Sequence, residues 1–247
     1  MERSLFLILT ISAIVIETVF TPLFLHYQRP GICLKSFLCK MTCASMFLAI
    51  AIISYIYSGN DSEFATFMLI GLSASWVGDL FLHVKKGSRV TFGIGMAFFA
   101  AAHVLYLISY AKATAIHFPD SKFLTIPEIL AAVAIIAILY VVINSKAKFD
   151  FSAPIIIAFV VYGLILATMF VKAASFGIQY IMAGNSVFAG LCLAFGGALF
   201  FCSDITLVIL MINEKLKKNY RLKDFNIASY FIAQTLLALS VLNVGLI

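Results

Sequence analysis

Long uninterrupted apolar segments dominate this chain and constrain its fold more than any other feature. Hydropathy marks eight of them, and all but the longer seventh are close to the roughly 20 residues that a helix needs to cross a bilayer. Their predicted bounds are 5–25, 37–57, 64–84, 90–111, 126–143, 152–171, 184–212 and 226–246. Continuous runs of this length exclude a membrane β-barrel, whose strands alternate apolar and polar residues. The sequence therefore predicts an all-α, polytopic integral membrane protein with eight transmembrane helices.

The composition places almost the whole chain in the membrane. Of its 247 residues, 63% are hydrophobic and 11% are charged, against about 25% charged residues in soluble domains. The connections between the apolar segments are too short to hold a separate fold, so residues 1–247 are predicted to form one compact bundle. The five cysteines form no CxxC pair, so we expect neither a disulfide framework nor a cysteine-ligated zinc site.

Lysine and arginine are spread unevenly over the predicted connections. The first, third, fifth and seventh connections carry Arg29, Lys35, Lys85, Lys86, Arg89, Lys146, Lys148, Lys215, Lys217, Lys218, Arg221 and Lys223. The second, fourth and sixth carry only Lys112, Lys122 and Lys172. Because basic connections stay on the cytoplasmic side, the odd connections are predicted to be cytoplasmic and both termini lumenal or external. The net charge of +6 then reflects topology and contact with membrane lipids, and nucleic acid is not an expected partner.

Two aspartates interrupt apolar segments that otherwise contain no acidic residue. Asp79 lies in GLSASWVGDLFLH, and Asp204 lies in GGALFFCSDITLVILM. A carboxylate near the centre of a bilayer costs about 2.5–3.5 kcal/mol to insert. Acidic residues kept at that cost are functional by default, so these two are the first candidate catalytic residues. The alternative is a pair of structural polar contacts inside the bundle.

Three more polar residues are predicted to lie near the depth of these aspartates. Lys40 stands near the cytoplasmic start of the second segment, and Gln234 stands about two turns into the eighth. His83 follows Asp79 by four residues and therefore shares its helix face. Lys40 and His83 can also extend to the headgroups, and Gln234 can simply bridge helices. Convergence of these groups at one depth predicts a buried polar pocket that opens toward the cytoplasmic leaflet.

The fourth and sixth segments add further candidates for this pocket. Phe99, His103 and Tyr106 are spaced by four and three residues, so they lie on one stripe of a helix. Tyr162 in the sixth segment is predicted at a comparable depth, and Ser203 precedes Asp204. A single histidine or tyrosine in a membrane more often bonds a neighbouring backbone, which is the structural alternative for each of them.

Two carboxyl groups that lie close together in a bundle can divide acid and base chemistry between them. One holds a proton while the other stays ionised, which suits an acid-driven hydrolysis through an oxocarbenium-like cation. Enol ethers hydrolyse in this way, by protonation of carbon and addition of water. The sequence contains no GxSxG elbow, and its four histidines are too scattered to suggest a three-histidine zinc site. We therefore expect neither a metal nor an organic cofactor.

Five segments together resemble the YhhN-like lysoplasmalogenase family of membrane proteins. They are GLSASWVGDLFL, GIGMAFFAAAHVLYLISY, VVYGLILATMF, GGALFFCSD and ASYFIAQTLLALS, and they occur in the family's order and spacing. The resemblance implies eight spans and hydrolysis of the vinyl ether bond of lysoplasmalogens, which are lysophospholipids with an alkenyl chain. The products are a fatty aldehyde and glycerophosphocholine or glycerophosphoethanolamine. The matching segments favour the endoplasmic reticulum over a bacterial plasma membrane.

The resemblance also implies roles for individual residues. The family's acidic positions fall on Asp79 and Asp204, and its positioning residues fall on His103, Tyr106, Tyr162, Tyr230 and Gln234. Its lysine of the second span falls on Lys40, with Lys35 as the rival position.

The expected mechanism divides the work between the two aspartates. One protonates the vinyl ether carbon, while the other stabilises the cation and orients water. Lys40 and His83 are predicted to tune the aspartates or face the phosphate, and Phe99 to line the channel for the alkenyl chain. Two other functions stay open at this point, namely a proton-coupled transporter and a non-catalytic lipid-binding protein.

Overall fold

The structure is a computed structural model that describes residues 1–59, 62–84, 89–146, 153–213, 215–242 and 244. Its helices are α1 (Arg3–Gln28), α2 (Leu34–Ser58), α3 (Glu63–Val84), α4 (Arg89–His117), α5 (Ile126–Lys146), α6 (Ala153–Met182), α7 (Val187–Ile212), the short 3₁₀ helix η1 (Leu216–Lys218) and α8 (Tyr220–Ser240). No strand occurs within these ranges. The all-α prediction is confirmed.

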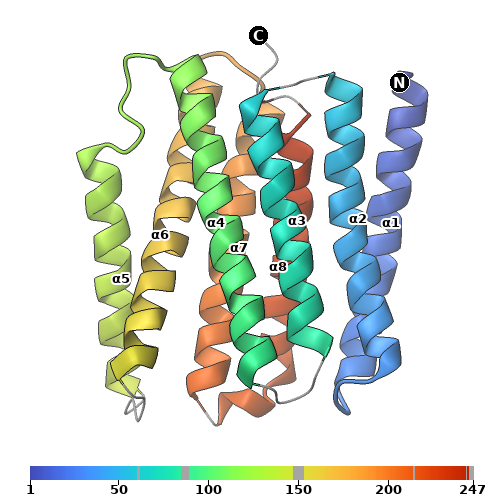
Figure 1. Cartoon of the computed structure of the whole chain (residues 1–247), viewed down its shortest axis with the longest axis vertical. Coiled ribbons are helices and arrows are strands. Elements are labelled where there is room, and N and C mark those ends of the chain that lie inside the picture. Colours follow the sequence, from blue (N-terminus) through green and yellow to red (C-terminus); the bar gives the residue numbers. More distant parts are fainter. Residues whose placement is uncertain (60–61, 85–88, 147–152, 214, 243, 245–247) are drawn as a thin grey trace.

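Successive helices run in opposite directions, so the start of α1 and the end of α8 lie at the same end of the bundle (Figure 1). Helices α7 and α8 lie behind α4 and α3 in that view. Helix α7 packs against α6 and α8, and α8 also contacts α1, α2 and α3, which closes the bundle around a buried centre. Helix α5 lies at the edge and packs mainly against α6.

Six of the helices are long and apolar enough to cross a membrane, namely α1, α2, α3, α4, α6 and α7. The described apolar part of α5 covers only Ile126–Val141. Helix α8 falls outside this group because Arg221, Lys223 and Asp224 occupy its start, which shortens its apolar part. A described helix covers most of each of the eight predicted segments, and six of these helices are membrane-spanning candidates by length and composition.

Five lysines and two arginines that the sequence analysis assigned to connections lie within α-helices instead, which is a correction. They are Lys35 in α2, Arg89 and Lys112 in α4, Lys146 in α5, Lys172 in α6, and Arg221 and Lys223 in α8. Lys172 is only 1% exposed, because its Nζ lies 3.3 Å from Glu128 Oε1 of α5. Hydropathy predicts that the sixth helix ends before Lys172. Because Lys172 has a buried acidic partner, the lysine can instead lie inside the helix.

Several of the basic residues that were used to orient the chain lie, wholly or with their side chains, outside the described part of the structure. These are Lys85, Lys86 and Lys148, together with the side chains of Arg89 and Lys146. The orientation therefore stays a prediction.

Helices α6 and α7 approach closely where two glycines face each other. A Cβ added to Gly177 would lie 2.5 Å from the carbonyl oxygen of Gly190, and one added to Gly190 would lie 2.6 Å from the carbonyl oxygen of Gly177. Small residues at such crossings let two membrane helices pack backbone to backbone. This contact fixes α7, and with it Asp204, against α6.

We expect Gly177→Ala to destabilise the protein by about 1–3 kcal/mol, because the neighbouring backbone cannot move aside as a flexible side chain would. The measurement is thermal unfolding in detergent. Gly93→Ala in α4 is the matched control, since nothing lies within 4 Å of its added Cβ. Alanine there should leave the unfolding temperature unchanged or raise it, because it is the better helix former. Equal losses in both variants would contradict the account of this contact.

Candidate active site

A cavity of about 220 Å³ lies among the helices and opens at the end of the bundle where α1 ends and α8 begins. Its polar lining consists of Gln28, Lys40, Asp79, His83, Tyr162, Ser203, Asp204, Asn226 and Tyr230. Its apolar lining consists of Phe24, Ile32, Leu82, Phe92, Met96, Phe99, Leu207, Ile227 and Phe231. The two aspartates from separate helices therefore face one cavity, as the sequence predicted.

Each carboxyl oxygen of Asp79 has a partner: one forms an ion pair and the other accepts a hydrogen bond. Lys40 Nζ of α2 lies 2.9 Å from Oδ1, and Tyr230 Oη of α8 donates to Oδ2 at 2.6 Å. Lys40 Nζ also lies 3.3 Å from the Asp79 carbonyl oxygen. Lys40 is 8% exposed and Asp79 2%, so the ion pair is almost fully removed from solvent. Each carboxyl oxygen of Asp79 therefore has a partner of its own, one on α2 and one on α8.

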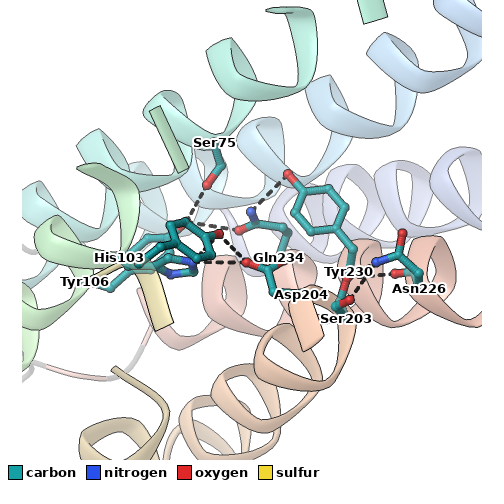
Figure 2. Close-up of polar contacts among 9 residues, drawn as sticks. Ser75, His103, Tyr106, Ser203, Asp204, Asn226, Tyr230 and Gln234 are labelled. Carbon is teal, nitrogen blue, oxygen red and sulfur yellow. Dashed lines mark hydrogen bonds and ion pairs between the residues drawn. The ribbon is translucent and has the colours of Figure 1, made fainter. Parts of the chain in front are cut away.

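A chain of hydrogen bonds extends from Tyr230 away from the cavity (Figure 2). Gln234 Nε2 donates to Tyr230 Oη at 3.1 Å, and Tyr106 Oη donates to Gln234 Oε1 at 3.0 Å. The Tyr106 hydroxyl also lies 3.2 Å from Ser75 Oγ. This chain joins α3, α4 and α8 behind Asp79, so Tyr106 and Gln234 hold Tyr230 in place without lining the cavity themselves.

Asp204 has a different set of neighbours. The Tyr162 hydroxyl donates to Asp204 Oδ2, and His103 Nε2 lies 3.4 Å from the same oxygen and 3.3 Å from Tyr162 Oη. Figure 2 shows His103 pointing at Asp204 from α4. Within the described part of the chain, the partners of this carboxyl group all contact Oδ2, and none of them is a lysine or an arginine.

Ser203 is held by the first turns of α8. Asn226 Nδ2 donates to the Ser203 carbonyl oxygen at 2.7 Å and to Ser203 Oγ at 2.9 Å, and Ser203 Oγ donates to the Asn226 carbonyl oxygen at 2.9 Å (Figure 2). This clamp fixes the turn of α7 that carries Asp204.

An aromatic cluster connects Tyr230, the partner of Asp79, with His103, the partner of Asp204. Phe99, Phe200 and Tyr230 meet edge to face, with ring centroids 5.5–6.5 Å apart, and the His103 ring lies 4.6 Å from that of Phe200. Such pairs are rigid and apolar, so they hold Tyr230 and His103 in fixed orientations. His83 lines the cavity from the last turn of α3, where its Nε2 is 3.0 Å from Ser36 Oγ of α2.

The structure brings most of the predicted site residues to one place. Those that line the cavity are Lys40, Asp79, His83, Phe99, Tyr162, Ser203, Asp204 and Tyr230, whereas His103, Tyr106 and Gln234 lie behind them. The sequence analysis missed Gln28 and Asn226, because both stand outside the predicted apolar segments or at their edge, where polar residues are expected. No group of three histidine, cysteine or acidic residues in the described part of the chain is placed to hold a metal ion.

The comparisons with known proteins decide which family this arrangement belongs to. The sequence model of the YhhN family matches residues 36–241, which is most of the chain. The chain belongs to the YhhN family. This match confirms the resemblance drawn from the five segments, and it covers every predicted site residue from Lys40 to Gln234.

A curated protein supports the YhhN assignment. It is named lysoplasmalogenase homolog, from Dictyostelium discoideum, and it is 26% identical to this chain over 212 residues. The alignment covers 75% of this chain but only 66% of the relative, just under two thirds of its length. No solved structure matches this YhhN protein at a significant level.

Proposed function

We propose that the protein is an intramembrane hydrolase that cleaves the vinyl ether bond of lysoplasmalogens, releasing a fatty aldehyde and a glycerophospho headgroup. One observation carries the proposal, namely that the two aspartates at the family's acidic positions face one cavity but have different partners. Membership of the YhhN family and similarity to a protein named lysoplasmalogenase homolog support the choice of substrate.

We assign the acid role to Asp204. One of its oxygens accepts from Tyr162, and no described residue donates to the other oxygen, so that oxygen can carry a proton toward the cavity. Asp79 suits the opposite role, because Lys40 and Tyr230 donate to both of its oxygens and favour the charged form. Lys40 therefore tunes Asp79 in this proposal, and the phosphate is left to the cavity mouth near His83.

The proposed reaction has two stages. Asp204 gives its proton to the vinyl carbon that is not bonded to oxygen, which leaves an oxocarbenium ion facing the Asp79 carboxylate. Water then adds to the oxygen-bearing carbon and returns a proton to Asp204. The resulting hemiacetal breaks its bond to the glycerol oxygen, which takes up a proton, so the net change is the addition of one water to give an aldehyde and an alcohol. His103 and Tyr162 hold Asp204 in position throughout.

The apolar lining offers a place for the alkenyl chain. Leu82, Phe92, Met96, Phe99 and Leu207 lie along the part of the cavity between α3, α4 and α7. A chain placed there would bring its first double bond next to the aspartates.

The substrate is tested by aldehyde release from detergent-purified protein. We expect aldehyde from a lysoplasmalogen and none from the matching lysolipid with a saturated alkyl ether, because a saturated carbon cannot accept the proton. Release of equal product from both lipids, or from neither, would contradict the proposal.

The proposed topology has eight spans in the endoplasmic reticulum, with both termini in the lumen. An N-glycosylation acceptor added before Met1 should be glycosylated in eukaryotic cells, whereas the same acceptor inserted next to Lys217 should not be. The lysine-rich connection between α7 and α8 is the reason, since positive charge stays on the cytoplasmic side. Glycosylation at the second site alone would contradict this topology and show that the protein has the opposite orientation in the membrane.

A further inference from the structure

The lining of the cavity is buried on one side and partly exposed on the other. The buried side comes mainly from α2, α3 and α8 and includes Lys40, Asp79 and Phe231. The side formed by α4 and α7 is apolar and partly exposed, and it consists of Phe92, Met96, Phe99 and Leu207, of which Phe99 alone is buried. This difference indicates a second, apolar opening in addition to the mouth at the ends of α1 and α8.

The first turns of α4 and α6 are loosely packed beside this apolar side. No described side chain of α4 before Phe99 is buried. In α6 no described side chain before Leu166 is buried, and Ile157 and Val161 are 62% and 51% exposed. Figure 1 shows the starts of the two helices apart from each other at the bottom of the view. The two helices are therefore not closed against each other at this end of the bundle.

Further along, the same two helices pack closely. The ring centroids of His103 and Tyr162 lie 5.7 Å apart, and those of Tyr110 and Phe176 lie 6.4 Å apart. The side opening is therefore confined to the end of the bundle that contains the cavity. Tyr162 stands at its inner edge and donates to Asp204, so the opening leads directly to one of the two aspartates.

The side opening lies at the depth where the first carbons of a membrane lipid are found. Met96 lies about two turns into α4, which is roughly 10 Å from the start of that helix. The headgroup layer on each side of a bilayer is about 5–7 Å thick. In a helix that begins at the membrane surface, Met96 therefore lies just inside the hydrocarbon. A lysolipid can keep its depth in the bilayer while its first carbons move sideways past Met96.

The cavity is too small to enclose a whole lysolipid. Pockets that enclose a drug-sized ligand have volumes of about 300–1,000 Å³, and a lysolipid with a long chain is at least as large as such a ligand. The cavity has a volume of about 220 Å³. Part of a bound substrate must therefore lie outside it, and the two openings offer separate places for the headgroup and for the chain.

Resting on the proposed function, we infer that the alkenyl chain leaves the cavity sideways: its first carbons lie beside the aspartates, and the rest of the chain passes between the first turns of α4 and α6 into the bilayer. Phe92 and Met96 contact the chain as it passes. The substrate enters and the aldehyde leaves by this side opening, and the protein does not select on the length of the chain beyond it.

The kinetic test narrows the side opening with a larger side chain, Met96→Trp. The variant is compared with the parent protein on two lysoplasmalogens, one with a four-carbon and one with a sixteen-carbon alkenyl chain. We expect kcat/KM for the long chain to fall about tenfold and that for the short chain to fall much less, because only the long chain passes the opening. Ile94→Trp is the matched control, since this exposed residue of α4 does not line the cavity and should leave both values unchanged.

Binding gives a second readout that does not depend on hydrolysis. Trp76 is the single tryptophan of the chain, so Trp76→Phe removes the native fluorescence. In that background Phe92→Trp reports from the side opening, and Ile32→Trp reports from the mouth after α1. A saturated alkyl analogue with bromine atoms in the middle of its chain should quench Phe92→Trp in a saturable way and leave Ile32→Trp bright. Excess analogue without bromine should restore the fluorescence.

The two readouts separate this inference from the proposed reaction. Quenching of Ile32→Trp in place of Phe92→Trp would overturn the inference. So would a Met96→Trp variant that loses no more activity with the long chain than with the short one. The expected quenching without any release of aldehyde by the parent protein would contradict the hydrolase but leave the side opening intact.

Discussion

Asp204→Asn is expected to reduce aldehyde release by about 10²- to 10⁴-fold, the range by which a positioned general acid accelerates a reaction. Asparagine has nearly the shape of aspartate, and it can still accept from Tyr162. It has no acidic proton to give to the vinyl carbon. The measurement is kcat for a lysoplasmalogen in detergent, made on variants whose unfolding temperature matches that of the parent protein.

Two comparisons isolate the role of Asp204. Asp120→Asn changes an exposed aspartate between α4 and α5 and should leave kcat unchanged. Tyr162→Phe removes the hydroxyl that donates to Asp204 but keeps the acid, so it should lower kcat less than Asp204→Asn does. An Asp204→Asn variant that stays folded and keeps the parent's activity would rule out this residue as the acid.

The largest expected effect on stability comes from the ion pair between Lys40 and Asp79. Lys40→Met should destabilise the protein by about 3–5 kcal/mol, because it leaves an uncompensated charge in the interior. The buried amine lies 2.9 Å from Asp79 Oδ1, and the structure gives that oxygen no other donor among the described residues. Thermal unfolding in detergent measures the change.

A double variant and an exposed pair provide the controls. Adding Asp79→Asn to Lys40→Met removes the unpaired charge, so the double variant should recover much of the lost stability. Lys112 and Glu63 form an ion pair at 2.8 Å near the surface, where side chains are 39% and 61% exposed. Lys112→Met should therefore cost only about 0.2–1 kcal/mol. If Lys40→Met lost no more stability than Lys112→Met, the claim that the buried ion pair stabilises the protein would be wrong.

The two aspartates were predictable from the sequence because an acidic residue in a long apolar segment stands out by itself. The residues that contact these aspartates were harder to predict. Which helix faces bring Lys40 to Asp79, and Tyr162 to Asp204, depends on how the helices are rotated against one another, which hydropathy does not encode. Glu17 shows the same limit: it also interrupts an apolar segment, yet it bonds Thr235 at 2.8 Å and does not line the cavity.

Errors and omissions arose mainly at the ends of helices. Lys172 looked like part of a connection because its buried partner, Glu128, lies 44 residues away in the chain. Gln28 and Asn226 looked like ordinary polar residues near connections, and only the structure shows that they line the cavity. Helix α8 was predicted from an apolar segment, but its charged start also lies within the helix. Hydropathy thus predicted the number and order of the helices, but it did not predict where they begin and end or which residues near their ends line the cavity.

The central claim is that water is added across a vinyl ether bond in this cavity. The most direct measurement is hydrolysis of an ethanolamine lysoplasmalogen by the purified protein in ¹⁸O-labelled water, with both products identified by mass spectrometry. Protonation of carbon followed by addition of water predicts a fatty aldehyde together with a glycerophosphoethanolamine that keeps its original oxygen. Absence of aldehyde, or ¹⁸O in the glycerol hydroxyl group, would contradict the account.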